Sequence, residues 1–391
     1  MARIATLIPV LLGLALFALG VKAQLLRLAL FLHQGLGFTD PYCTTGYCDY
    51  SMFWLAGIFA HHGQGALLYD HTRYAALASH ILPYQSGWWP FVYPPTILLP
   101  AALIASLPLA AGYYALSALT LAASALLLRR ANIPRWCILA GLISPAAMWN
   151  LYLGQFGLLC GALLAYGLAT MHARPLRAGA ALSLLAIKPQ YALLVPVAVL
   201  ARRNWRTLIA GALGLLFLLA LSCIFGGTAT WAAYLGPGRA AMRTLLNQPF
   251  APGYQAMGSS VFWMLRSLHA SLPLAYAGQG AVSLTCALAT WRLWRNNSEN
   301  RLPVTVFLSL LASPYGFTDD LAIYSVLLPT LARRNTPWRN AALAWLYVAP
   351  AFIPKFVTAF GFLPTPLLLL AALCLAQQKQ RLFTKKISQR A

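Results

Sequence analysis

The chain is short of charged residues, and acidic residues are the scarcest of them. Only 9% of its 391 residues are charged, and Asp and Glu together number 6. A soluble globular protein carries about 25% charged residues, so this composition excludes a soluble enzyme, a disordered protein and a coiled coil. The apolar runs are continuous and do not alternate, which also argues against a transmembrane β-barrel.

Several short motifs that mark common catalytic and binding sites are missing as well. The sequence has no zinc-ligand spacing, no phosphate-binding glycine loop, no G-x-S-x-G turn and no dinucleotide fingerprint. Its 7 histidines are scattered without a ligand pattern. We therefore expect no metal and no cofactor.

Apolar residues dominate what is present. They make up 60% of the chain, the mean hydropathy is +0.68, and apolar runs of about 20 residues recur from end to end. The sequence thus predicts an all-α integral membrane protein, with residues 1–391 forming a single polytopic membrane domain.

The basic residues fit this interpretation. The formal net charge of +22 is compatible with a nucleic-acid surface, but the cations cluster at the ends of apolar runs, as at Arg129-Arg130, Arg202-Arg203 and Arg333-Arg334. Cytoplasmic loops of membrane proteins carry such an excess of Lys and Arg. We expect membrane lipid, and no nucleic acid, among the partners.

Assigning every basic cluster to the cytoplasm gives a topology. Both termini are then cytoplasmic, and the first apolar run is an uncleaved span because no clear signal-peptide cleavage site follows it. The segment 95–107 is expected to be a juxtamembrane or re-entrant helix on the outer side. About twelve spans are predicted, at roughly 4–30, 109–128, 134–150, 154–172, 176–189, 190–201, 207–226, 273–294, 302–315, 320–333, 341–354 and 362–376.

Two long segments, 31–94 and 227–272, become periplasmic loops in this topology. Neither is apolar enough to span a bilayer, but both contain short helical patterns. Ser51–His62 and His71–Leu82 have the spacing of amphipathic interfacial helices. Loops of this kind indicate a site at the outer face of the membrane.

The few carboxylates concentrate on that outer side. Carboxylates near a bilayer are costly and usually functional. A purely structural interpretation is available for three of them, because Asp40 precedes a proline in a turn and Asp49 and Asp70 stand where helices are predicted to begin. Only Glu299 is assigned to the cytoplasm, whereas the outer side holds Asp40, Asp49, Asp70, Asp319 and Asp320.

Two of the seven cysteines share the first periplasmic loop. Cys43 and Cys48 are separated by four residues that include Gly46, and an oxidising compartment permits a disulfide between them. Free thiols at both positions are the alternative. The other five cysteines fall within apolar spans, where packing explains them.

Several short motifs occur in order along the chain. They are DYSMFWLAG at Asp49–Gly57, LYD at Leu68–Asp70, YPP at Tyr93–Pro95, NLYLGQ at Asn150–Gln155, IKPQ at Ile187–Gln190, RRNWR at Arg202–Arg206 and SPY at Ser313–Tyr315 with Asp319 and Asp320. Together these motifs resemble glycosyltransferase family 87 of the GT-C superfamily, which comprises polyprenyl-phosphate-mannose-dependent and related transferases. One departure is that relatives often carry a histidine where this chain has Tyr315.

The resemblance implies a GT-C-like bundle of about twelve transmembrane helices in a bacterial inner membrane, with the active site facing the periplasm. It implies an inverting hexosyltransferase, with mannose favoured, that uses a polyprenyl-phosphate sugar donor and a glycolipid or glycan acceptor. A lipid-linked sugar flippase or a secondary transporter is the alternative, because such proteins also have about twelve spans and broken helices.

The chemistry assigns roles to particular residues. An acceptor hydroxyl needs a general base as it attacks the anomeric carbon, and the first-loop Asp49 is the candidate. The departing lipid phosphate needs cations, for which the candidates are Lys188, Arg239, Arg243 and Arg266. Lys188 lies beside a proline at bilayer depth and is expected to have a buried anionic partner. The remaining predicted substrate-binding residues are Tyr93, Gln155, Gln190, Tyr315, Asp319 and Asp320.

Overall fold

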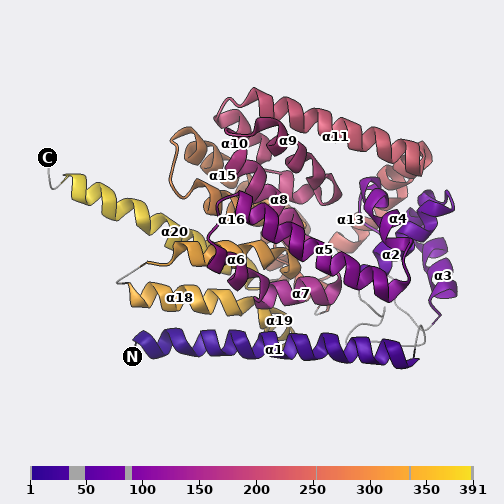
Figure 1. Ribbon diagram of the computed structural model, residues 1–391, viewed down its shortest axis with the longest axis horizontal. Helices are drawn as coiled ribbons and strands as arrows, with labels where there is room; N and C mark the ends of the chain where they lie inside the picture. The colour runs from indigo at the N-terminus through magenta and orange to yellow at the C-terminus, as the bar shows by residue number, and fades with distance from the viewer. Residues whose placement is uncertain (1, 35–48, 84–89, 252, 334–335, 389–391) are drawn as a thin grey trace.

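The computed structural model describes the backbone of residues 2–34, 49–83, 90–251, 253–333 and 336–388. Within these ranges the chain folds into helices joined by short loops and forms no strand. Figure 1 shows α1 (Ala2–Gln34) and α11 (Trp205–Gly226) along opposite edges of the bundle, with most of the other helices between them. The predicted all-α class is confirmed.

Four helices are long and apolar enough to cross a membrane. They are α1, α11, α5 (Leu109–Arg130) and α15 (Leu272–Arg295). Two bent pairs can each form a further, broken span. These pairs are α6 (Arg135–Leu142) with α7 (Pro145–Leu153), bent by 53°, and α18 (Pro337–Val348) with α19 (Ile353–Phe360), in which the helical segments are bent by 72°.

Length and composition therefore support four to six spans in the described part of the chain. A helix or a broken helix does occupy each of the twelve predicted segments, but the apolar stretch in each of the others is short, and the count of twelve stays a prediction. The remaining elements are α8 (Gly157–Thr170), α9 (Pro175–Ser183), α10 (Val195–Ala201), α16 (Arg301–Ala312), α17 (Ala322–Leu327) and α20 (Thr365–Ser388), of which the apolar part is Thr365–Ala376.

Short helices also lie within the predicted periplasmic segments and beside the first of them. The helices expected at Ser51–His62 and His71–Leu82 are confirmed as α2 and α3. Asp40, Cys43 and Cys48 lie outside the described residues. The bounds of these helices are α2 (Asp49–His61), α3 (His71–Ile81), α4 (Leu98–Ala105), α12 (Thr228–Ala233), α13 (Arg239–Asn247) and α14 (Val261–Ser267).

Burial distinguishes α2 from α3. In α3 only Tyr74 and Ala78 are buried, as expected of a helix with one apolar face, and the side chain of Asp70 caps it by accepting a hydrogen bond from the Arg73 backbone N–H at 3.2 Å. In α2, by contrast, nine of the thirteen residues are buried. The expectation that α2 is amphipathic is therefore wrong, because it is packed beneath α4 and α5.

Tight turns and caps connect these helices. Single turns of 3₁₀ or π geometry occur at Gly65–Tyr69, Pro95–Ile97, Leu184–Ile187, Pro189–Ala192, Tyr234–Gly238, Tyr254–Met257, Thr318–Leu321, Leu328–Leu331 and Ala349–Ala351. The break between Ile187 and Pro189 is the one that the sequence predicts at Lys188. It places that lysine in the interior of the bundle rather than along a helix surface.

The buried side-chain amide of Gln279 connects α14, α15 and α16 through hydrogen bonds. Gln279 of α15 accepts a hydrogen bond from the backbone N–H of Phe262 in α14 at 3.0 Å. It donates to the carbonyls of Leu311 and Ala312 in α16 at 3.2 and 3.1 Å. Such bonds satisfy backbone groups that lipid cannot satisfy.

The outer surface of α11 is apolar and exposed. Leu213, Phe217 and Ile224 expose 61%, 65% and 82% of their area. A contiguous apolar surface of this kind in water would favour aggregation, whereas in a bilayer it contacts acyl chains. The exposure pattern thus agrees with a membrane-spanning α11.

The topology predicts that the segment 227–272, which precedes α15, is periplasmic and that the end of α15 is cytoplasmic. In a background with all seven native cysteines replaced, we expect Gly236→Cys to react with a membrane-impermeant thiol reagent from the periplasm. Asn296→Cys should react only after the cytoplasmic side is opened. Both positions are exposed, and nothing lies within 4 Å of a Cβ added at Gly236. Reaction of both from the same side would overturn this topology.

Candidate active site

A cavity of about 670 Å³ lies where the predicted periplasmic segments meet the bundle. Its charged lining residues are Asp49, Lys188 and Asp319, and the rest of the lining is polar, aromatic or apolar. Tyr93, Gln155, Gln190 and Tyr315 also line it. The volume is in the range of small-molecule and cofactor sites.

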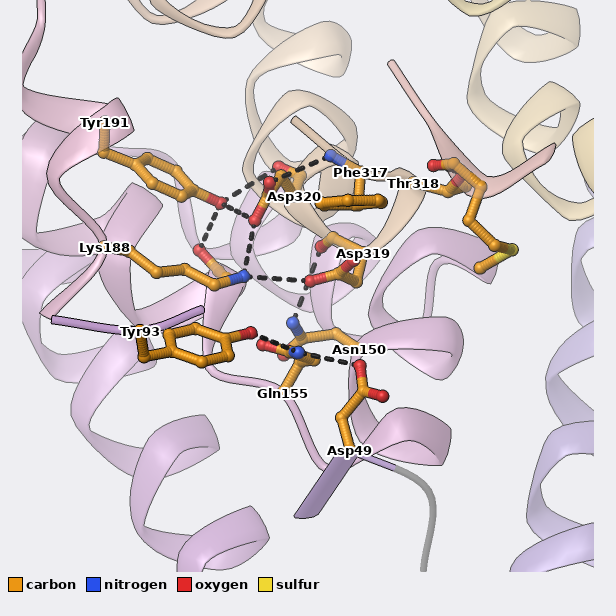
Figure 2. A network of polar contacts seen from close by, with 12 residues as sticks. Asp49, Tyr93, Asn150, Gln155, Lys188, Tyr191, Phe317, Thr318, Asp319 and Asp320 are labelled. Carbon is orange, nitrogen blue, oxygen red and sulfur yellow. Dashed lines mark hydrogen bonds and ion pairs between the residues drawn. The ribbon is translucent and has the colours of Figure 1, made fainter. Parts of the chain in front are cut away.

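Asp49 is the first residue of α2 and is half-buried at the cavity wall. Its Oδ2 accepts a hydrogen bond from Nε2 of Gln155 at 2.8 Å, as Figure 2 shows. Burial raises the pKa of Asp49, while the hydrogen bond from Gln155 and the charge of Lys188 lower it. A carboxyl group with a raised pKa is a better proton acceptor than an ordinary surface aspartate.

Gln155 bridges two residues of this wall. The same Nε2 that donates to Asp49 also donates to the hydroxyl of Tyr93 at 2.8 Å. Burial raises the pKa of Tyr93, so its hydroxyl stays protonated and neutral. Asp49, Gln155 and Tyr93 therefore form one polar row along the cavity.

The turn that carries Gln155 is closely fixed. Gly154 ends α7 in the left-handed region at φ 68°, and a Cβ at this position would collide with Tyr50 of α2. The side-chain amide of Asn150 is oriented so that both its nitrogen and its oxygen form hydrogen bonds. The nitrogen donates to the carbonyl of Gln155 at 3.0 Å, and the oxygen accepts from the N–H of Gly157 at 2.9 Å. The turn between α7 and α8 thus presents Gln155 to Asp49 in one arrangement.

Lys188 lies deeper and is paired with two aspartates. Its Nζ is 3.1 Å from Oδ2 of Asp319 and 2.8 Å from Oδ1 of Asp320, and all three side chains are at most 4% exposed (Figure 2). The ammonium also lies 5.4 Å from the ring centre of Phe156. The expectation of a buried anionic partner for Lys188 is confirmed.

Further bonds hold this ion cluster in place. The hydroxyl of Tyr191 donates to Oδ1 of Asp320 at 2.9 Å, and Oδ2 of Asp320 accepts from the N–H of Phe317 at 3.1 Å. Asp320 is therefore fully engaged, whereas Asp319 borders the cavity. With two carboxylates to one ammonium, the ionised cluster carries a net charge of −1.

Aromatic rings form another part of the wall. Tyr254 and Tyr315 share a hydrogen bond between their hydroxyls at 3.0 Å, and both rings contact Phe317 with centres 5.1 and 5.3 Å away. Nearby, the Thr318 hydroxyl donates to the carbonyl of Met257 at 2.8 Å. Residues 254–257 of the predicted periplasmic segment 227–272 are thereby joined to the loop after α16.

The structure brings most of the predicted site residues together, but not the arginines. Arg239 and Arg243 are exposed on α13, whose other side contributes Met242 and Leu245 to the cavity. Arg266 donates to the carbonyls of Ala270 and Gln248 at 2.7 and 3.2 Å and does not line the cavity. Seven predicted residues do line it, namely Asp49, Tyr93, Gln155, Lys188, Gln190, Tyr315 and Asp319, while Asp320 contacts it only through Lys188.

Sequence reasoning missed some residues of the site. Tyr191 directly follows the motif that ends at Gln190 and could have been found by extending that motif. Tyr254 lies in the second long segment without a motif, and no sequence signal marks it. Among the described residues, no group of three or more His, Cys, Asp or Glu side chains is placed to hold a metal ion.

Comparison with known families gives a match. The model of the family described as glycosyltransferase family 87 matches residues 91–314, which is more than half of the chain. Tyr93, Gln155 and Lys188 lie within the match, whereas Asp49, Asp319 and Asp320 lie outside it. Comparison with curated proteins and with solved structures gives no match.

Proposed function

The chain belongs to glycosyltransferase family 87, and from this premise we propose that it transfers a hexose, with mannose favoured, from a polyprenyl-phosphate donor to a periplasmic glycolipid or glycan. The chain is a glycosyltransferase and, by its apolar helices, a multi-pass membrane protein. We further propose a bacterial inner membrane, cytoplasmic termini and an active site open to the periplasm. The observation that carries the proposal is the half-buried carboxylate of Asp49 at the wall of a cavity large enough for a sugar.

Asp49 is the proposed general base. The acceptor hydroxyl gives its proton to the carboxylate as its oxygen bonds to the anomeric carbon. The bond from that carbon to the phosphate oxygen breaks, and its electron pair leaves with the lipid phosphate. One base is sufficient for such an inverting transfer.

The ion pair of Asp319, the other carboxylate of the cavity, favours Asp49 as the general base. Burial raises the pKa of Asp319, but its Oδ2 accepts from the buried ammonium of Lys188, which lowers that pKa and occupies the oxygen. Asp49 accepts from a neutral amide and has no direct ion pair among the described residues. Its carboxylate is therefore the more available proton acceptor.

The donor phosphate is better matched to the arginines of α13 than to Lys188. The charge of Lys188 is already offset by two aspartates, so it offers little attraction to a further anion. Arg239 and Arg243 are exposed and lie one helical turn apart, on the helix that also lines the cavity through Met242. We propose that they hold the phosphate at the mouth of the cavity while the sugar enters it.

The test is sugar transfer by the purified full-length protein in detergent. Polyprenyl-phosphate donors carrying radiolabelled mannose, glucose, galactose or arabinose would be offered with a lipid extract of the source membranes as acceptor. We expect one donor to yield a labelled product that Asp49→Asn does not form. Movement of donors across proteoliposome membranes without any labelled product would instead identify a flippase or transporter.

A further inference from the structure

We propose that Gln155 is a positioning residue: it holds the carboxylate of Asp49 in the orientation that accepts a proton, and it keeps that carboxylate ionised. The claim rests on the proposed function only where it takes Asp49 to be the base. Its structural content, that the hydrogen bond from one buried amide lowers the pKa that burial raises at Asp49, is independent of any substrate.

The donors of Gln155 are both already used inside the protein. A side-chain amide nitrogen carries two protons, and those of Gln155 go to Oδ2 of Asp49 and to the hydroxyl of Tyr93, each at 2.8 Å. Neither proton is left for a sugar hydroxyl. The hydroxyl of Tyr93 accepts from Gln155 and so keeps its own proton, which it can donate within the cavity.

The orientation of this amide is determined by its neighbour. Turning the group over would bring the amide oxygen against the carboxylate oxygen of Asp49, where two acceptors repel each other. In the observed orientation the Oε1 of Gln155 is buried without a hydrogen-bond partner among the described residues. An unsatisfied buried acceptor destabilises the fold, so the orientation is maintained at a cost by the bonds to Asp49 and Tyr93.

The backbone around Gln155 is braced independently of Asp49. The Gln155 N–H donates to the Asn150 carbonyl at 2.8 Å, and the amide of Asn150 donates back to the carbonyl of Gln155. Phe156 packs against Phe53 of α2, with ring centres 5.0 Å apart. Because these contacts fix the turn relative to α2, the amide cannot follow Asp49 if the carboxylate rotates away.

Among the described residues, Gln155 is the side chain that donates a hydrogen bond to the carboxylate of Asp49, whereas the other groups act on it only through their charge. One cation, Lys188, acts on it, but that charge is shared between two aspartates. The negative charge of Asp319, which is paired with Lys188, repels that of Asp49. The remaining titratable groups in electrostatic contact with Asp49 are the neutral phenols of Tyr74, Tyr93, Tyr254 and Tyr315.

Loss of the hydrogen bond from Gln155 is expected to raise the pKa of Asp49. The hydrogen bond from Gln155 stabilises the ionised form of Asp49, so it lowers a pKa that burial raises. Without the bond the pKa rises further, and Asp49 stays protonated up to a higher pH. A protonated carboxyl cannot accept a proton, so the acidic limb of the pH–rate profile moves to higher pH.

Infrared titration of the full-length protein tests this without a substrate. The chain has only 6 Asp and Glu residues, so the C=O stretch of protonated Asp49 can be assigned by subtracting the spectrum of Asp49→Asn. In Gln155→Met, which is close in size but has no donor, we expect the titration midpoint of Asp49 to rise by about 1–2 pH units, as for losing a hydrogen bond to a charged group. Gln155→Asn keeps the amide but is one methylene shorter, and it should shift the midpoint in the same direction.

The matched control is Gln190→Met, the same chemical change on a residue that lines the same cavity without a hydrogen bond to Asp49 in the described structure. It should leave the midpoint of Asp49 within a few tenths of a pH unit of the parent protein. No shift in either Gln155 variant, or an equal shift in Gln190→Met, would overturn the proposal. Absence of sugar transfer in the parent protein would count against the proposed function and leave this titration result standing.

Once transfer is measured, kinetics add a second readout. For a positioning residue, the acidic limb of kcat/KM in Gln155→Met should move by the same amount as the infrared midpoint, and the KM for the donor should stay near the parent value. A raised KM with an unmoved acidic limb would show instead that Gln155 binds substrate directly.

Discussion

Asp49→Asn is expected to reduce sugar transfer by about 10²–10⁴-fold, the usual contribution of a positioned general base. Asparagine has nearly the same size and shape, and its side-chain oxygen can still accept the hydrogen bond from Gln155. The fold and the KM for the donor should therefore change little. The lost property is the capacity to accept a proton, which would appear as a lower kcat in purified, folded protein.

Two further variants make this result interpretable. Asp70→Asn removes a charge from an aspartate that caps a helix but lies outside the cavity, and transfer should stay close to the parent rate. Asp319→Asn tests the other cavity carboxylate. Near-normal turnover of Asp49→Asn together with a large loss in Asp319→Asn would move the base to Asp319.

Lys188→Met is expected to destabilise the protein by about 3–5 kcal/mol, the effect of removing one partner from a buried ion pair. The change leaves Asp319 and Asp320 next to each other without a cation, and both side chains are at most 4% exposed. Thermal unfolding of parent and variant in the same detergent measures the effect as a lower midpoint. Arg243→Gln, which removes an exposed cation, should stay within about 0.5 kcal/mol of the parent.

A double variant separates charge from packing. Lys188→Met combined with Asp320→Asn leaves a single carboxylate in place of two, so it should be more stable than Lys188→Met alone. If Lys188→Met unfolds at the parent temperature, the ion pairs of Lys188 with Asp319 and Asp320 do not stabilise the fold as we propose. The phosphate would then have to be reconsidered as the partner of Lys188.

Periodicity and charge predict much of the fold. The apolar runs coincide with α1, α5, α11 and α15 because a continuous apolar stretch of this length has few other stable conformations in a membrane. The break at Lys188 was predictable because proline follows it. The burial of α2 was not, because it depends on α4 and α5, which pack around it from later in the chain.

The candidate site was predictable as a set of residues but not as a set of bonds. Asp49 and Gln155 are separated by 106 positions, and no local pattern relates them. The sequence indicated that Lys188 needs an anion but could not decide between a bound phosphate and the two aspartates that it contacts. Arg266 is predicted as a phosphate ligand from its charge alone, whereas its backbone carbonyl partners depend on the tertiary fold.

The ion cluster also imposes an order on biosynthesis. The ribosome makes Lys188 131 residues before Asp319, so the nascent chain carries a lone ammonium at a helix break while the intervening helices enter the membrane. A charge at that depth without a counter-ion is unfavourable and draws water or lipid phosphate toward it. We therefore expect the helices on either side of Lys188 to reach their final packing only after Asp319 and Asp320 have been synthesised and inserted. Chains that terminate before Asp319 should keep this region open and be recognised by membrane proteases.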